Sequence, residues 1–371
     1  MTTPEVSSQL LRKERLQGRR KLSGHYTRRR VARGAILAFL IGYVLVTLIP
    51  FYILFVRTFV GTKDAPQLWL WPPTQKPISM EAELGNLSVF YNLDIKEFKR
   101  HFGIKGYVQP RKTLAEIAGE HDIPPEQIQR YLAPFGRFNG WYVLFGQGLI
   151  WGPLARTLLI TVLIVVIGNL LSILTAFGLA GLRRRDQMFI YNLYLLRMVI
   201  PPMMIILPQF LIIQWLIDLI PGTESAGFPR YATQLSSLVI IFLVGDALAI
   251  MVYTAAISAL PRDLEDAAHL DGASRLQYLW YVVLPLLKVH IASVIVMTLP
   301  WIWNMFLQPF VYLDPDNTTL IPFIQGFSGR YATNFQVTFT GVFVSILPLA
   351  LVYILFRRLF IRGIMAGALK G

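Results

Sequence analysis

Three carboxylates, Asp263, Glu265 and Asp266, stand close together in a short polar stretch between two apolar segments. No nucleophile, carboxylate pair or metal-ligand cluster with a suitable spacing occurs in the loops, so the sequence predicts neither a catalytic nor a metal site. Carboxylates are favourable in the first turn of a helix, where the helix dipole attracts negative charge. Small residues at 267–268 and Gly272 follow and leave room for another protein's backbone. The stretch therefore predicts a docking helix that ends in a glycine turn, with an ordinary interhelical loop as the alternative.

Polar side chains inside the apolar segments form a second group of candidates. Arg197 and Asp246 lie at membrane depth, where an unpaired charge is costly, so we expect them either to pair with each other or to line a transport path. Amide and indole groups suited to the hydroxyls and ring faces of a sugar occur at Gln209, Trp301, Asn304 and Gln308. The alternative role for these groups is hydrogen bonding between helices or placement at the membrane interface.

These candidates lie on or between six apolar segments. The chain has 371 residues, of which 54% are hydrophobic and 15% charged, a composition typical of a membrane protein. A window of about 19 residues places the segments at 34–56, 154–182, 188–216, 235–260, 281–306 and 339–356. Each is long enough to cross a bilayer as a helix. Within the third, Pro201, Pro202 and Pro208 are expected to kink or break the helix.

The distribution of basic residues sets the expected orientation. Ten Lys and Arg residues lie between positions 12 and 33, whereas two short loops on the opposite side carry one each, Arg230 and Arg330. We therefore expect a multi-pass membrane protein with both termini cytoplasmic and no cleavable signal peptide. This placement accounts for the formal charge of +14 without a nucleic-acid partner. Because the chain contains no cysteine, a disulfide framework and a thiolate metal site are excluded.

The long loop 57–153 is expected to lie outside the cytoplasm, and its stretch 97–138 has the pattern of a folded unit. Thr113 and Glu116 form a capping-box pattern, and Pro125 can open a second helix. The result resembles a helix-turn-helix pair, but its expected position excludes DNA recognition. We expect the unit to pack against another protein. The alternative is a wall-binding or sensory membrane anchor that acts through this unit.

The docking stretch also matches a known motif in its spacing. The pattern is Asp266-Ala267-Ala268, then Gly272, then Val282, Leu284 and Pro285. It resembles the cytoplasmic signature of the inner-membrane permeases of binding-protein-dependent ABC importers, with Asp in place of Glu and Val in place of Ile. The resemblance extends from about residue 153 to the end of the chain. It is closest to the sugar-importer, MalG-like branch, through Trp303-Asn304 and the glycine-rich stretch 360–371.

The resemblance implies an all-α polytopic membrane protein with six transmembrane helices, a cytoplasmic coupling helix, and a small helical extracytoplasmic insertion between helices 1 and 2. The implied parts are a basic cytoplasmic arm (1–33), the first transmembrane helix (34–56), the insertion (57–153), a five-helix permease core (154–360) with its coupling segment (261–285), and a cytoplasmic tail (361–371). Residues implied to transmit ATPase movement are Glu265, Asp266, Ala267, Ala268, Gly272, Leu284 and Pro285.

The function implied is that of a permease subunit of an ATP-driven importer for a sugar or oligosaccharide. The sequence has no phosphate-binding loop of the Walker type, so the chain is not expected to be an enzyme or to hold a cofactor. The implied partners are two copies of an ABC ATPase, a second, MalF-like permease and an extracytoplasmic solute-binding protein. Permeases for glycerol phosphate, polyamines or other solutes remain alternatives.

Overall fold

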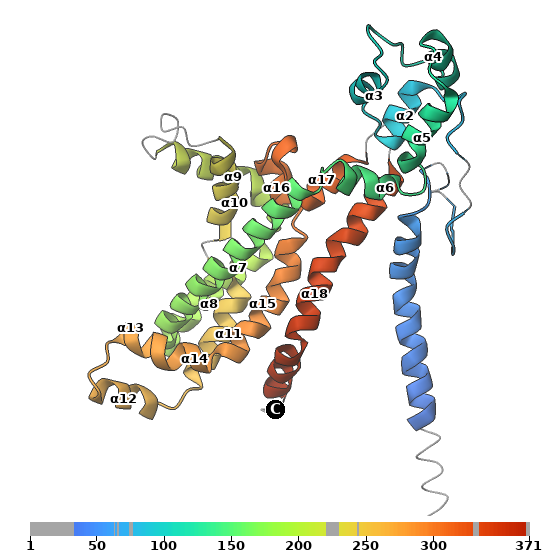
Figure 1. Cartoon of the computed structure of the whole chain (residues 1–371). Coiled ribbons are helices and arrows are strands. Elements are labelled where there is room, and N and C mark those ends of the chain that lie inside the picture. The colour runs from blue at the N-terminus through green and yellow to red at the C-terminus, as the bar shows by residue number, and fades with distance from the viewer. Residues whose placement is uncertain are drawn as a thin grey trace, which may run out of the picture.

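The computed structural model describes residues 33–62, 64, 67–73, 77–219, 230–242, 245–328 and 334–368. For residues 197–198, 217–218, 230–233 and 358–368 within these ranges it describes the backbone alone. The described part is helical and contains no named β-strand. The insertion lies at one end of the molecule, and the docking stretch at the other (Figure 1).

Three helices in the described part are long and apolar enough to cross a membrane unbroken. They are Arg33–Arg57, Trp151–Ala180 (α7) and the Phe335–Arg357 part of Phe335–Ala368 (α18). At about 1.5 Å per residue, a helix of this length exceeds the hydrocarbon thickness of a bilayer, about 30 Å. Helix α7 packs against α11 (Ala247–Ser258) and α15 (Lys288–Trp303), and α15 packs against α18. Over most of its length the helix Arg33–Arg57 stands apart from this bundle (Figure 1), but its end meets α18, where the ring centroids of Phe55 and Phe343 lie 5.2 Å apart.

The third predicted span is interrupted where its prolines predict a break. Helix α8 (Arg184–Val199) ends before Ile200, which is extended with ψ 120°, and α9 (Pro202–Asp218) follows. The residue before a proline is pushed out of the helical region, and a proline is well placed at the first position of the next helix. The predicted break at Pro201 and Pro202 is confirmed. Pro208 lies inside α9 and does not end it.

The fourth and fifth spans also differ from the predicted continuous helices. The fourth is divided into α10 (Arg230–Ile241) and α11, and Gly245 between them has φ +80°. The fifth, expected from residue 281, begins as α15 at Lys288, after a bend of 72° from the preceding helices. The sixth is longer than expected, because α18 continues to Ala368 through most of the predicted tail. Two helix pairs, Ala247–Ser258 with Asp263–Leu270 and Arg275–Leu286 with Lys288–Trp303, are bent by 76° and 72°. Counting each of these pairs as one span gives up to five crossings in the described part, so six crossings remain a prediction.

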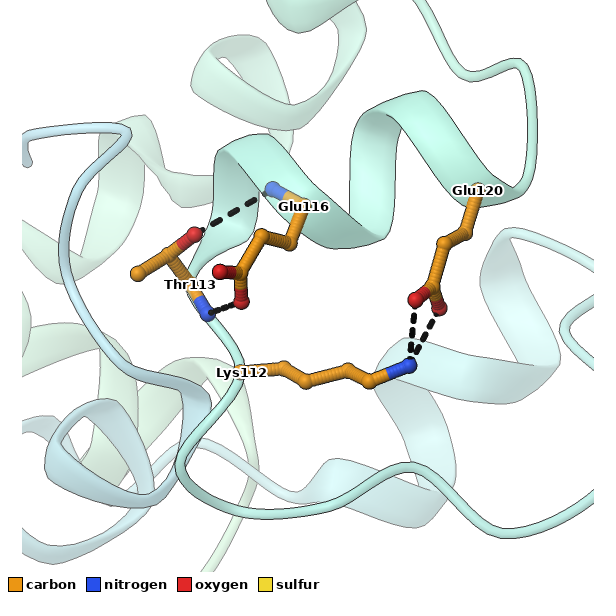
Figure 2. Close-up of polar contacts among 4 residues, drawn as sticks. All are labelled: Lys112, Thr113, Glu116 and Glu120. Carbon is orange, nitrogen blue, oxygen red and sulfur yellow. Dashed lines mark hydrogen bonds and ion pairs between the residues drawn. The ribbon is translucent and has the colours of Figure 1, made fainter.

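The insertion between Arg33–Arg57 and α7 is a compact group of short helices. They are α2 (Leu84–Tyr91), α3 (Ile95–His101), α4 (Leu114–Glu120) and α5 (Pro125–Leu132), followed by short turns to Gly146. The capping box is confirmed: Thr113 Oγ1 accepts from Glu116 N–H (3.2 Å), and Glu116 accepts from Thr113 N–H (3.0 Å) (Figure 2). An ion pair joins Lys112 to Glu120 beside it (Figure 2). The folded unit starts before the expected residue 97, since α2 supplies fully buried Leu84 and Leu87.

The insertion contains two helix pairs that repeat with an offset of 30 residues. The pairs meet reciprocally: Leu84 N–H donates to the carbonyl of Lys112, and Leu114 N–H donates to that of Ala82, both at 3.0 Å. The turn inside each pair uses a left-handed residue, Asn92 (φ 56°) in the first and its equivalent, Asp122 (φ 53°), in the second. Both pairs bury their apolar faces in a single shared core. Neither pair could bury that face without the other.

The base of the insertion is bonded to the start of α18. Gln336 is fully buried, and its Nε2 donates to the carbonyls of Thr58 (3.1 Å) and Arg137 (2.6 Å). Gly140, in the short helix α6 (Asn139–Trp141), lies directly against α18 at Thr340. These contacts fix the insertion to a helix that runs the length of the bundle (Figure 1).

Candidate coupling segment and membrane cavity

The predicted docking helix is α12 (Asp263–Leu270), and it projects from the bundle. It is bent by 76° from α11 and has no buried residue. Its first turn contains Asp263, Glu265 and Asp266, as the helix dipole favours. Leu270 is 90% exposed at its end. The side chains of α12 are therefore accessible from outside the bundle.

The predicted glycine turn ends α12 as a Schellman motif. Gly272 has φ +77°, its N–H donates to the carbonyl of His269 (3.0 Å), and Ala273 N–H donates to that of Ala268 (2.9 Å). Only glycine adopts this left-handed conformation without strain. A Cβ built at Gly272 would meet no atom within 4 Å. The choice of residue at position 272 is therefore restricted by the backbone conformation and not by neighbouring atoms.

A second set of short helices returns the chain to the bundle. Ser274 caps α13 (Arg275–Tyr278) in a capping box with Gln277. Tyr278 is buried, and this burial, followed by the charge of Glu265, raises the pKa of its phenol. A π-helical turn and α14 (Leu284–Leu286) then lead into α15.

The predicted coupling residues divide into two groups by exposure. The first group is exposed and consists of Asp266, Ala267, Gly272 and Pro285. Glu265 is half-buried but lies in the same exposed first turn of α12 as Asp266. Ala268 and Leu284 are half-buried and pack against the cluster that joins the segment to α7, α11 and α15. The first group is available to a partner, and the second connects the segment to the bundle. Leu270 and Leu276, exposed apolar residues of the same segment, were not among the predicted coupling residues.

A cavity of about 450 Å³ lies within the bundle, between α7, the α10–α11 break and α15. Its walls are mostly apolar. Polar groups in the walls belong to Asn169, Ser172, Asp246, Thr298 and Trp301. The volume falls within the range of small-molecule sites, about 300–1,000 Å³.

Asp246 lines this cavity at the start of α11. Its carboxylate accepts from Leu248 N–H (3.1 Å), which caps the helix, and its own N–H donates to Ser172 Oγ (3.3 Å). The break before it lets a carboxylate at membrane depth satisfy a backbone donor. The side chain of Arg197, in the last turn of α8, lies outside the described side chains. Pairing between Arg197 and Asp246 therefore stays a prediction.

Of the four amide and indole candidates, Trp301 is the one that lines the cavity. Trp301 is 56% exposed, and its ring meets that of Phe242 edge-on with the ring centroids 5.6 Å apart. Asn304 instead donates to the carbonyl of Pro300 (2.8 Å) at the end of α15. Gln209 lies on α9, and Gln308 on α16 (Leu307–Tyr312), outside the cavity wall. The structure thus brings together Trp301 and Asp246 of the predicted path residues, and it adds Asn169 and Thr298.

Long apolar helices, interrupted spans around a cavity and a projecting bent segment are features of a multi-pass membrane protein. Residues 168–365 match the family described as "Binding-protein-dependent transport system inner membrane component". The match covers more than half of the chain, which belongs to this family. The family consists of transport permeases, which confirms the resemblance stated from the 266–285 motif.

Named relatives and a solved structure are similar to the chain. The starch degradation products permease AmyC of Thermoanaerobacterium thermosulfurigenes, described as probable, is 29% identical over 218 residues, 58% of this chain and 74% of that protein. The arabinooligosaccharides permease AraQ of Halalkalibacterium halodurans is 27% identical over 235 residues, 63% and 79% of the two chains. A bacterial ABC transporter involved in the import of the acidic polysaccharide alginate shares the fold with a TM-score of 0.54. It is 18% identical, and the alignment covers 88% of this chain and 95% of that one.

Proposed function

We propose that this chain is one permease subunit of an ATP-driven importer for a sugar or oligosaccharide, and that α12 receives the movement of a cytoplasmic ATPase. The observation that carries the proposal is the exposed, sharply bent α12 within the region that matches the permease family. Relatives whose names specify starch products and arabinooligosaccharides support a saccharide over glycerol phosphate or a polyamine. Family membership favours transport over a membrane anchor that acts through the insertion.

The proposed orientation places α12 and both termini in the cytoplasm of a bacterial cell. The Arg33 end of the first helix and the C-terminal end of α18 lie at the same end of the molecule as α12 (Figure 1). Arginines at 183–185 adjoin that end of α7. A side rich in arginine is the side that remains in the cytoplasm. The insertion is then extracytoplasmic.

The proposed assembly contains two copies of an ATPase, a second, MalF-like permease and a solute-binding protein. One projecting α12 serves one ATPase copy, so the second copy needs another permease. We propose that the insertion packs against the solute-binding protein or the partner permease, because it is fixed to α18 through Gln336 on the extracytoplasmic side. Rigid-body movement of packed helices would alternate access to the path between them.

The substitution Gly272→Leu tests the role of α12. We expect normal membrane insertion, continued ATP hydrolysis and a large loss of ATP-driven uptake in proteoliposomes that contain the assembled transporter. The reason is that leucine would project into the open surroundings of Gly272, where the ATPase is proposed to dock.

The matched control is Gly103→Leu in the insertion. Gly103 has φ +65°, ends α3 in the same Schellman geometry and also has no atom within 4 Å of a built Cβ. Both substitutions therefore have a similar backbone cost, about 1–2 kcal/mol. Full uptake by the Gly272 variant would contradict the docking role, and the melting temperature of the Gly103 variant gives the destabilisation expected from the backbone cost alone.

A further inference from the structure

The wall chemistry of the cavity restricts what it can bind. Among the described lining residues Asp246 is the only ionisable side chain. An ionised carboxylate only accepts hydrogen bonds, and its two oxygens can accept about four. The Leu248 N–H takes one of these positions. The remaining lone pairs can take donors from a ligand.

The other polar groups have part of their hydrogen bonding satisfied within the bundle. The hydroxyl of Thr298 donates to the carbonyl of Val294 (3.0 Å), so its oxygen is left as an acceptor. The amide of Asn169 donates to the carbonyl of Val165 (2.7 Å) and accepts from the hydroxyl of Tyr253. The wall thus offers acceptors at Asp246 and Thr298, and donors in the hydroxyl of Ser172 and the indole N–H of Trp301, beside the exposed face of that residue.

We propose that Asp246 and Trp301 form a subsite that binds an uncharged sugar ring, with hydroxyls donating to the carboxylate and a C–H face on the indole. This inference rests on the proposed transport function and specifies its substrate class. A sugar acid would bring a second negative charge next to Asp246 in a mostly apolar cavity, which is unfavourable. A polyamine would bring several ammonium groups, and this wall offers a single carboxylate to pair with them.

Cysteine protection tests the subsite directly, because the chain has no cysteine of its own. Met297 lines the cavity and is exposed, so a Met297→Cys variant places a single thiol there. The variant is assembled with its partner subunits in proteoliposomes, and its alkylation by N-ethylmaleimide is followed on this chain by mass spectrometry. The probes are maltotriose, a uronic acid trisaccharide and spermidine at matched concentrations.

We expect maltotriose to slow alkylation, and the uronate and spermidine to leave it unchanged. Adding Asp246→Asn keeps the helix cap, because asparagine caps as well as aspartate, but removes the charge. The maltotriose concentration needed for protection should then rise about tenfold, the factor that corresponds to about 1.4 kcal/mol of a charge-assisted hydrogen bond. The control Asp316→Asn, at an exposed carboxylate outside the cavity, should change nothing.

The outcomes separate this subsite from the transport function as a whole. ATP-driven saccharide uptake is measured in the same proteoliposomes. Protection by none of the probes, equal protection by the uronate, or protection by spermidine alone would overturn the subsite even with uptake intact. The absence of ATP-driven saccharide uptake by the wild-type chain would instead overturn the proposed function.

Discussion

Replacing Gly140 with alanine tests how tightly the insertion is held to α18. A Cβ built at Gly140 would lie 2.1 Å from Thr340 Oγ1, 2.7 Å from the carbonyl oxygen of Gln336 and 3.0 Å from Thr340 Cβ. The side chain of Thr340 is buried and its hydroxyl donates to the same carbonyl (2.7 Å). Neither neighbour can move away alone, so α6 and α18 must separate.

The expected cost follows from these contacts. Overpacking a buried contact costs about 1–3 kcal/mol. Separation would also weaken the hydrogen bonds of Gln336 to Thr58 and Arg137, each worth about 1 kcal/mol. We therefore expect Gly140→Ala to lower the free energy of unfolding by about 2–4 kcal/mol. Thermal unfolding of the purified chain in mild detergent, read by tryptophan fluorescence, would report the loss.

Two further variants sharpen this test. Gly119→Ala in α4 has open space around its Cβ, so it should be neutral or stabilise by about 0.5–1 kcal/mol. Adding Thr340→Ala to Gly140→Ala removes the closest contact but leaves the one to the backbone oxygen of Gln336, so rescue should be partial. If Gly140→Ala unfolded like Gly119→Ala, or if Thr340→Ala restored full stability, the packing argument would be refuted.

Three other predictions concern single interactions. Thr113→Ala should lower the stability of the insertion by about 1 kcal/mol, whereas Thr113→Ser should not. Hydrogen exchange of the Glu116 amide would report this difference, and equal exchange rates in the two variants would contradict the cap. Burial, and then the charge of Glu97, raise the pKa of Tyr131 to about 12, so this phenol stabilises the fold fully below pH 10 and loses that effect as pH rises through 12. The difference between wild type and Tyr131→Phe in a titration at 295 nm should have its midpoint near pH 12, and a midpoint near pH 10 would refute the shift. Trp303 Nε1 donates to the carbonyl of Ser345 (3.0 Å), so Trp303→Phe should destabilise the bundle by about 1–3 kcal/mol. Thermal unfolding would measure this loss, and an unchanged unfolding midpoint would count against a contribution of this hydrogen bond.

The coupling segment could be predicted from sequence because its determinants are local. The first-turn carboxylates, the small residues and Gly272 act within a few positions of one another, and the Schellman turn follows from them. The capping box at Thr113 is local in the same way. The motif spacing to Pro285 could be identified for the same reason, although the π-helical turn and the bend before Lys288 could not.

The cavity could not be predicted, because its residues come from three separated helices. Hydropathy is the same for an unbroken span and for one divided at Gly245, so the sequence pattern placed Asp246 inside a helix, where an ionic partner is needed. The break gives it a backbone donor instead. Asn169 and Thr298 carry no local signal that separates a cavity wall from a helix contact.

The repeat in the insertion was missed because its two halves share apolar positions and few identities. Leu84 and Leu114 correspond, as do Phe98 and Ile128, and all four are fully buried in the same core. Such apolar pairs recur by chance in any helical stretch. The reciprocal hydrogen bonds between the halves, which distinguish a repeat from coincidence, exist only in three dimensions.

The shared core of the two repeats has a consequence for the order of assembly during synthesis. Its partners lie about 30 residues apart in sequence, and such local contacts form early. The base of the insertion, by contrast, waits for Gln336, which is separated by 199 residues from Arg137 and by 278 from Thr58. We therefore expect the insertion to fold while later helices are still being made and to be attached last, when α18 arrives. Nascent chains arrested before residue 336 should already protect the amides of α2 and α4 from hydrogen exchange, and unprotected amides there would show that α18 is needed first.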